Sequence, residues 1–434
     1  MSESPSREEV LKARFAIEYI KNPLLERFLR YVKVHTTSDE NAPEGKKPST
    51  DIQLNLAKLL FKELQELGVP ASNVSLDEHG CVLAKIPATP GYENCPSIIF
   101  NSHMDTSCAC SGENVKPQIH ENYDGKPLNI GNGIIIDQEN SPSIKSAIGD
   151  TVITSDGSTL LGADDKCGVS EIMTLVDVLL NHQKDINHGP IEVMFNCDEE
   201  IGNGTLYFPK DKVDSKIGFT IDGDVEGSLE YENFNAYTYI ANFIGRSCHT
   251  GSARGKFANA AVMASTFVSM LPRSESPEAT DGRYGFYCPI SIKGEHESAK
   301  VVLILRDFDM NGLKRRIATC DAIAKAVEAM FPGGKVETIA KLGYLNMYDK
   351  LKDHPEVIDN VKLAFNRVNV KTFVNPIRGG TDGSTMTSKY DIMTPNLYTG
   401  SDGFHSRYEW AALGQMISMV QVMIEIVKIY AEKK

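Results

Sequence analysis

Three short motifs contain histidine or acidic residues that could do chemistry. The first is His103-Met104-Asp105, which follows the apolar run 97–100. Residues two apart in an extended chain point to the same side, so His103 and Asp105 could reach one site. An imidazole that binds zinc needs a hydrogen-bond acceptor to fix its tautomer, and aspartate is a common choice. A histidine at a strand end beside an unrelated turn aspartate explains this short motif about equally well.

The second motif is Asp164-Asp165, which stands just before a helical pattern that starts near Val169. Carboxylates at a helix N-terminus commonly cap the free backbone N–H groups, and the pair taken alone favours this structural role. The functional alternative is that one of the two carboxylates bridges a pair of metal ions.

The third motif is Cys197-Asp198-Glu199-Glu200, directly after the apolar run 191–196. Open α/β sheets place their sites at the carboxyl ends of the strands. An acidic surface loop is the common alternative. Unpaired charges at the rim of a core are costly without a cation, however, so this motif favours a functional site.

Two further segments complete the candidate set. Asp222 stands at the end of another apolar run, and His405 lies in Gly403-Phe404-His405-Ser406. Imidazole and carboxylate ligands without cysteine suit Zn²⁺, with Mn²⁺ or Co²⁺ as alternatives. One tetrahedral zinc cannot use this many carboxylates, so two metals that share a bridging ligand are the simplest interpretation. The candidates are His103, Asp164, Glu199, Glu200, Asp222 and His405.

The elements that position these residues predict an α/β fold with a mostly buried sheet. Short apolar strands and amphipathic helices alternate in the first half of the chain, and the Gly-, Asn- and Pro-rich segment 116–150 is predicted to be a long functional loop. From about residue 234 the pattern becomes strand, helix, strand, helix, at 236–244, 258–270, 299–308 and 313–331. We therefore predict a catalytic domain at 1–233 and 343–434, split by a smaller α+β domain at 234–342.

The composition of the chain bears on which surfaces it binds and where in the cell it is found. The chain has 434 residues with 45 Lys and Arg and 58 Asp and Glu, a net charge of −13, which argues against a nucleic-acid or anionic membrane surface. Its nine cysteines are scattered without a C-x-x-C pair, and the N-terminus lacks an apolar signal region. The apolar stretch 410–424 is too short and too polar for a membrane span and predicts a core helix. We therefore expect a cytoplasmic protein.

Taken together, the motifs resemble those of the peptidase T family, the tripeptide aminopeptidases among the dinuclear zinc exopeptidases, which are related to carboxypeptidase G. The matching segments span residues 23–410 in the family's order and include SHMDTS, LLGADDKCGVSEIM, CDEEIGNGT, TIDGDVEG, CHTGSARGKFANA, LRDFD, IRGGTDGS and GSDGFHSRYEW. The resemblance implies a mixed sheet flanked by helices, with the inserted domain as a lid. It also implies peptide substrates, and it leaves a homodimer as one option.

The resemblance also implies a role for each matching residue. Asp164 would bridge two zinc ions, and the peptide bond that follows it would be cis. Asp105 would orient His103, and Glu199 would be the general base that takes a proton from a zinc-activated water. The remaining zinc ligands would be His103, Glu200, Asp222 and His405. In the lid, His249 would stabilise the oxyanion, and the groups that position substrate would be Asn259, Arg306 and Arg378.

Some positions depart from the family pattern. Cys108 and Ala109 stand where Pro-Asp is usual, Asp224 replaces a glycine, and Cys288 replaces a histidine. Two other interpretations therefore stay open. One is a related amidohydrolase, either a dipeptidase or an N-acyl-amino-acid hydrolase, and the other is a peptide-binding protein that has lost catalysis.

Overall fold

A computed structural model describes residues 5–433 and divides them into two compact units. Unit 2 consists of Glu232–Tyr348 and Pro376–Gly380. Unit 1 takes the described residues as far as Tyr231, then Asp349–Asn375, and then those from Thr381 onward. The chain therefore leaves unit 1 and returns to it twice.

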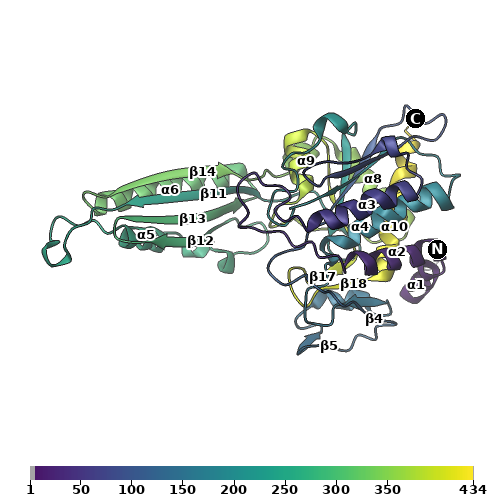
Figure 1. The fold of residues 1–434 in the computed structure, drawn as a ribbon, viewed down its shortest axis with the longest axis horizontal. Helices are drawn as coiled ribbons and strands as arrows, with labels where there is room; N and C mark the ends of the chain where they lie inside the picture. The colour runs from purple at the N-terminus through teal and green to yellow at the C-terminus, as the bar shows by residue number, and fades with distance from the viewer. Residues whose placement is uncertain (1–4, 434) are drawn as a thin grey trace. The chain divides into compact units, whose positions relative to one another are not determined.

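Unit 1 is built on an eight-stranded mixed sheet (Figure 1). The inner strands β8, β3, β9 and β16 are mutually parallel, whereas β2 and β10 run antiparallel to their neighbours β8 and β16. Strands β8 and β3 are buried along their whole length, which explains why each contains an apolar run, at 193–195 and at 98–100. In sheet order the strands are β1 (Val74–Leu76), β2 (Val82–Ile86), β8 (Ile191–Asn196), β3 (Ile98–His103), β9 (Ile217–Gly223), β16 (Asn396–Tyr398), β10 (Ser228–Glu230) and β15 (Phe373–Val374).

Helices flank this sheet, as expected for an α/β fold. Helix α4 packs along β3 and β9, and α2 and α10 pack against α4. The helices are α1 (Arg7–Phe15), α2 (Glu18–Tyr31), α3 (Gln53–Glu66), α4 (Ala163–Asp177), α8 (Pro355–Arg367), α9 (Asp382–Tyr390) and α10 (Leu413–Ala431), and the short α7 (Tyr348–Leu351) lies at the boundary with unit 2. Helix α10 is long and apolar enough to cross a membrane, but 83% of its apolar window is buried, as in a core helix.

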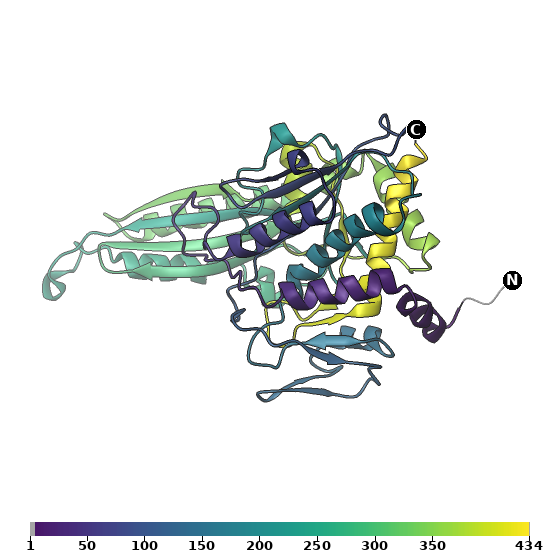
Figure 2. The ribbon, with the colours of Figure 1, turned by 45° about the vertical axis from the view of Figure 1, so that its right-hand side comes forward.

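The segment 116–150 is more ordered than a loop, so that part of the sequence prediction was wrong. It forms the short strand β4 (Gln118–His120) and the hairpin of β5 (Leu128–Gly131) and β6 (Ile134–Ile136). In Figure 2 it makes a small blue layer below the main sheet. Its side chains share a buried cluster with Trp410. Strands of three or four residues are too short to show an alternating pattern, which is why the sequence did not reveal them.

A second small sheet pairs strands of this part of the chain with two strands that precede the C-terminal helix. Its order is β17 (Ser401–Asp402), β18 (Trp410–Ala412), β7 (Val152–Thr154) and β4. Because β17 and β18 pair as a hairpin, residues 403–409 form the turn between them. This turn carries His405.

Unit 2 is a four-stranded antiparallel sheet with two helices packed on one face. The order is β12 (Phe286–Gly294), β13 (Ser298–Asp307), β11 (Asn235–Ile244) and β14 (Lys335–Leu342), and the helices are α5 (Ala260–Ser269) and α6 (Met310–Met330). Alternate residues of β11 and β13 form the core with both helices. The strands β12 and β14 were missed in the sequence because most of their residues are exposed and give little apolar alternation.

Candidate metal centre

The candidate ligands meet because of the way the sheet orders its strands. Strands β8, β3 and β9 are parallel neighbours, so their carboxyl ends lie at the same edge. His103 ends β3, Glu199 and Glu200 follow β8, and Asp222 is the next-to-last residue of β9. Asp164 joins them from the start of α4, where residue Gly162 has a positive φ of 85°.

The first group of ligand atoms gathers around His103. Its Nε2 lies 2.9 Å from Oδ1 of Asp164 and 3.5 Å from Oδ1 of Asp222. The potential ligand atoms of these three residues all lie within 4.8 Å of one another.

The second group lies on the other oxygen of Asp164. Nε2 of His405 lies 3.2 Å from Oδ2 of Asp164 and 2.8 Å from Oε2 of Glu200. The potential ligand atoms of these three residues also lie within 4.8 Å of one another. Asp164 therefore offers one oxygen to each group, which is the arrangement of a carboxylate that bridges two ions. The peptide bond between Asp164 and Asp165 is cis, as the resemblance implies.

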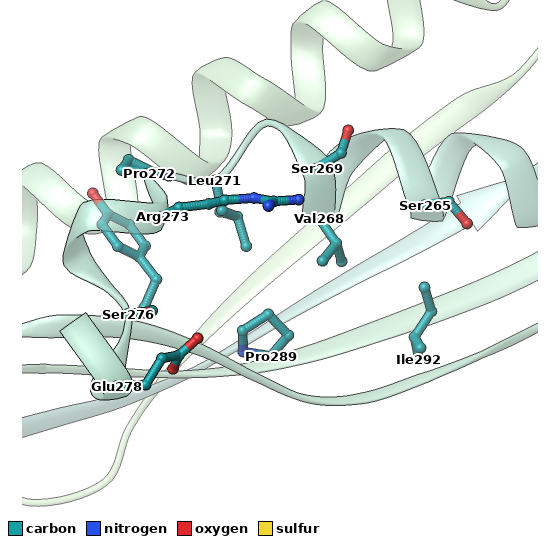
Figure 3. Close-up of a pocket in the computed structure, with 11 residues that line it drawn as sticks. Ser265, Val268, Ser269, Leu271, Pro272, Arg273, Ser276, Glu278, Pro289 and Ile292 are labelled. Atoms are coloured by element: carbon teal, nitrogen blue, oxygen red, sulfur yellow. The ribbon is translucent and has the colours of Figure 1, made fainter.

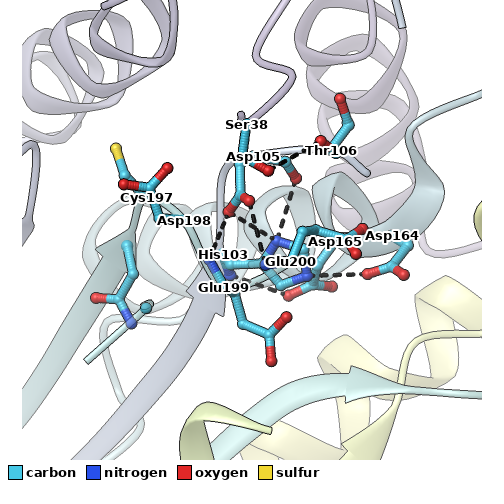
Figure 4. A network of polar contacts seen from close by, with 12 residues as sticks. Ser38, His103, Asp105, Thr106, Asp164, Asp165, Cys197, Asp198, Glu199 and Glu200 are labelled. Atoms are coloured by element: carbon cyan, nitrogen blue, oxygen red, sulfur yellow. Dashed lines mark hydrogen bonds and ion pairs between the residues drawn. The ribbon is translucent and has the colours of Figure 1, made fainter. Parts of the chain in front are cut away.

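Asp105 and Glu199 lie close to His103 (Figure 4). Oδ1 of Asp105 lies 3.3 Å from Nδ1 of His103, the ring nitrogen that faces away from Asp164. The same carboxylate accepts hydrogen bonds from the backbone N–H groups of Glu199 and Glu200, at 3.0 and 3.2 Å. Asp105 thus ties the histidine to the loop that carries both glutamates.

Burial makes the negative charge of this centre costly. It raises the pKa of Asp222 to about 7 and that of Glu200 to about 7, and it raises the pKa of Glu199 well above its usual range. Burial acts in the same direction on Asp164, but hydrogen bonds from His103 and His405 outweigh it and lower that pKa. The hydrogen bonds to Asp164 and Glu200 raise the pKa of His405 to about 11.

A cation fits these observations. Oε1 of Glu200 is buried and has no hydrogen-bond partner among the described residues, which is costly for a carboxylate oxygen. Imidazole and carboxylate donors without thiolate match zinc, manganese or cobalt. Positive charge at the two groups would stabilise the ionised carboxylates that burial opposes.

Two neighbouring aspartates contribute contacts that the sequence did not predict. Asp165 faces Ser102 and accepts a hydrogen bond from the backbone N–H of His103, at 3.2 Å. Asp198 has a positive φ of 65°, and its side chain accepts hydrogen bonds from Ser49 and Gln53. Both hold ligand-bearing loops in place, a role that the sequence analysis assigned to neither of them.

The four predicted substrate-positioning residues all belong to unit 2. His249 is exposed, and its Nδ1 accepts a hydrogen bond from the N–H of Gly251. Asn259 caps α5 through bonds from Ala261 and Val262.

The two arginines of this set have local partners. Arg306 donates to the carbonyl of Leu305 at 3.1 Å and lies over the ring of Tyr344. Arg378 donates to the carbonyls of Gly282 and Tyr284, both at 2.8 Å. Each residue therefore has a structural contact, and its contact with substrate remains a prediction.

The departures from the family pattern fall in both units. In unit 1, burial raises the pKa of Asp224 to about 6, and repulsion from Asp402 and Asp164 adds to the shift. In unit 2, Cys288 is half-buried in β12 and packs against the cluster of Phe234, Phe286 and Phe308. Cys108 is exposed.

A cavity of about 470 Å³ lies within unit 2, between α5 and β12 (Figure 3). Its walls are Val268, Leu271, Pro289 and Ile292, with Arg273 and Glu278 among the polar groups. No candidate ligand and no predicted substrate-positioning residue lines it.

Comparison with known proteins decides the family. The model of peptidase family M20/M25/M40 matches residues 160–429, more than half of the chain. The chain belongs to this family. Peptidase T of Clostridium perfringens (strain 13 / Type A) is 43% identical over 408 residues, which cover 94% of this chain and 99% of the relative. Peptidase T of Listeria welshimeri is 40% identical, covering 96% of this chain and all of the relative.

Solved structures of the M20 family and its relatives share the fold. A tripeptidase of Staphylococcus aureus superimposes with a TM-score of 0.74 at 20% identity, covering 95% of this chain and 99% of the other. Aminopeptidase PepT of Bacillus cereus superimposes with a TM-score of 0.72 at 22% identity, with the same coverage of both chains. A Bacillus subtilis M20 protein, described as a dinuclear metal-binding peptidase, gives 0.64 at 12% identity, covering 96% of this chain and 100% of the other. These matches confirm the predicted resemblance and fold class. This M20 member is an enzyme that hydrolyses peptides.

Proposed function

We propose that the chain is a tripeptide aminopeptidase that binds two zinc ions and uses Glu199 as its general base. The observation that carries this proposal is the division of Asp164 between two ligand groups, with one carboxylate oxygen facing each. One ion would be held by His103, Asp164 and Asp222, and the other by Asp164, Glu200 and His405.

Zn²⁺ at these positions would supply a Lewis acid that lowers the pKa of water and polarises the scissile carbonyl. Glu199 would then accept the proton of that water and deliver it to the leaving amine. Its loop is held in place, since Asp105 accepts a hydrogen bond from the backbone N–H of Glu199 at 3.0 Å.

The substrate contacts are also part of the proposal. The lid, at 234–342, would supply His249 as the donor to the oxyanion and Asn259 and Arg306 as positioning groups, and Arg378 would join them. Tripeptides are favoured because the near-full-length relatives are named peptidase T. The nine cysteines are all free, which supports a reducing, cytoplasmic location. A homodimer stays one option.

Metal removal combined with a substrate panel tests this function. Chelation should abolish the hydrolysis of tripeptides, and added Zn²⁺ should restore it, while Co²⁺ and Mn²⁺ show which other ions are accepted. Tripeptides with a free amino terminus should be cleaved faster than dipeptides and N-acyl-amino acids. Activity that survives thorough chelation contradicts the metal mechanism, and faster cleavage of dipeptides or acyl substrates assigns the chain to the related amidohydrolases.

A further inference from the structure

Glu409 is a buried carboxylate that belongs to neither ligand group. It is 2% exposed and lies just before β18. Its Oε2 accepts hydrogen bonds from the backbone N–H groups of Leu161 and Gly162, both at 2.7 Å. Its Oε1 accepts a third, from the N–H of Asp164, at 2.9 Å. One side chain thus binds three amides of the segment that delivers the bridging ligand.

The backbone of this segment is irregular. Gly162 is in the left-handed region, and Asp164 has φ −84° and ψ 104°, outside the helical range, although α4 has already begun. The first N–H groups of a helix have no partner within the helix, and the Asp164 side chain is turned toward the two histidines instead of capping them. Glu409 supplies the missing acceptor from about 245 residues away in the chain.

The same turn also carries a ligand. His405 and Glu409 both belong to residues 403–409, between β17 and β18. Nε2 of His405 lies 3.2 Å from Oδ2 of Asp164, while Glu409 holds the backbone of that residue. The turn therefore contacts Asp164 at both its side chain and its backbone, and it is tied internally by a hydrogen bond from the N–H of Tyr408 to Ser406.

A buried cation accompanies this carboxylate. Lys166 is 1% exposed, and its Nζ donates to the carbonyl of Val34 at 2.7 Å. Its charge attracts both Glu409 and Asp105. Three N–H dipoles and this ammonium group favour the ionised form of Glu409, while burial opposes that form and raises the pKa of Glu409 to about 7.

We propose that Glu409 is a positioning residue for the metal centre. By holding the amides of residues 161–164, it aims the two oxygens of Asp164 at the two ligand groups. Its hydrogen-bond partners are backbone amides, and it belongs to neither ligand group. This inference rests on the proposed dinuclear function, and it adds a residue outside both ligand groups that sets how tightly the ions are bound.

The test compares Glu409→Gln with a matched buried carboxylate. The substituted side chain presents N–H₂ where Glu409 presents an oxygen, so at least one backbone N–H meets a donor. Glu192 is the control: it is 1% exposed and also accepts two backbone N–H bonds, from Asp214 and Ser215. It lies near the start of β8, seven residues before Glu199. Glu192→Gln therefore disrupts a similar set of backbone hydrogen bonds far from the metal centre.

Zn²⁺ binding to the full chain is measured by competition with a chromophoric chelator, and the visible spectrum of the Co²⁺-loaded protein reports ligand geometry. Glu409→Gln should weaken the affinity for metal by about 10- to 100-fold and alter the Co²⁺ spectrum. Glu192→Gln should change neither the affinity for metal nor the Co²⁺ spectrum, even if it lowers the melting temperature. An unchanged affinity and spectrum for Glu409→Gln, with two ions bound in the parent protein, overturns this inference alone.

Failure of the parent protein to bind two ions would instead overturn the proposed function. If Glu409→Gln does not fold, Glu409→Asp, which keeps the charge but withdraws it by one methylene, is measured under the same criteria. If neither variant folds without metal, Glu409 serves the fold and the inference is wrong.

Discussion

At the scale of single residues, Asp164 and Glu199 are both acids at one centre, yet their surroundings assign them different roles. Asp164 has a histidine against each oxygen and a lowered pKa, so it is held as an anion. Burial raises the pKa of Glu199, and the repulsion of nearby acids adds to the shift. A permanently ionised group suits a metal bridge, whereas a group that can take up a proton suits a general base.

Replacing Glu199 tests this assignment. Glu199→Gln should lower turnover of a tripeptide by about 100- to 10,000-fold, because the amide cannot accept the proton. Metal content, measured by elemental analysis, should stay at the parent value. Glu200→Gln is the comparison, and it should lose metal as well as activity because it removes a proposed ligand. A Glu199→Gln variant that retains more than a tenth of the activity would show that another group is the base.

At the scale of elements, a buried polar network joins the helices α2, α3 and α4. Glu63 of α3 joins α2 through Arg27, Arg30 and Tyr31, with contacts of 2.8, 2.5 and 2.7 Å. Arg27 also donates a hydrogen bond to Asp177 of α4, the helix whose first turn carries the proposed bridging ligand. The network thus fixes the far end of α4.

Glu63→Gln should destabilise the protein in a pH-dependent way. Burial raises the pKa of Glu63, but the bonds from Tyr31 and Arg27 outweigh it, and the folded-state pKa is below the unfolded value of 4.5. The stabilising contribution is therefore complete above about pH 4.5 and is lost as the pH falls through the lower, folded-state pKa.

The measurement is urea unfolding from pH 7 downward, with metal present. At pH 7 the variant should lose roughly 1.5–3 kcal/mol of unfolding free energy, and its deficit should shrink toward the acid end. Glu66→Gln, in an exposed pair with Lys62 on the same helix, should cost well under 1 kcal/mol at any pH. A deficit that is constant with pH would mean that packing, and not charge, explains the effect of Glu63→Gln.

The elements also show what the sequence could predict. Strands β3 and β8 were predictable because each is buried and contains a short apolar run, and the candidate acids stand just after these runs. The role of Glu409 was not predictable, because its partners at 161–164 are distant in the chain and are backbone groups without a sequence signature. Likewise, the exposed strand β14 has no apolar face to detect.

At the scale of the whole molecule, the net charge of −13 gains a partial explanation. Asp105, Asp164, Glu199, Glu200 and Asp222 bring five acidic side chains to one edge of the sheet. Two divalent ions would offset most of that charge. The sequence could predict this concentration from strand-end motifs, but only the fold shows that one carboxylate faces two groups.

The most direct test of the central claim is the number of Zn²⁺ ions bound per chain, measured by titrating the metal-free protein in a calorimeter. We predict two ions for the parent chain, one for His405→Ala, and a severe loss of both for Asp164→Ala, because only Asp164 belongs to both ligand groups. A parent chain that binds a single ion, or an Asp164→Ala variant that still binds two with unchanged affinity, would contradict the dinuclear centre.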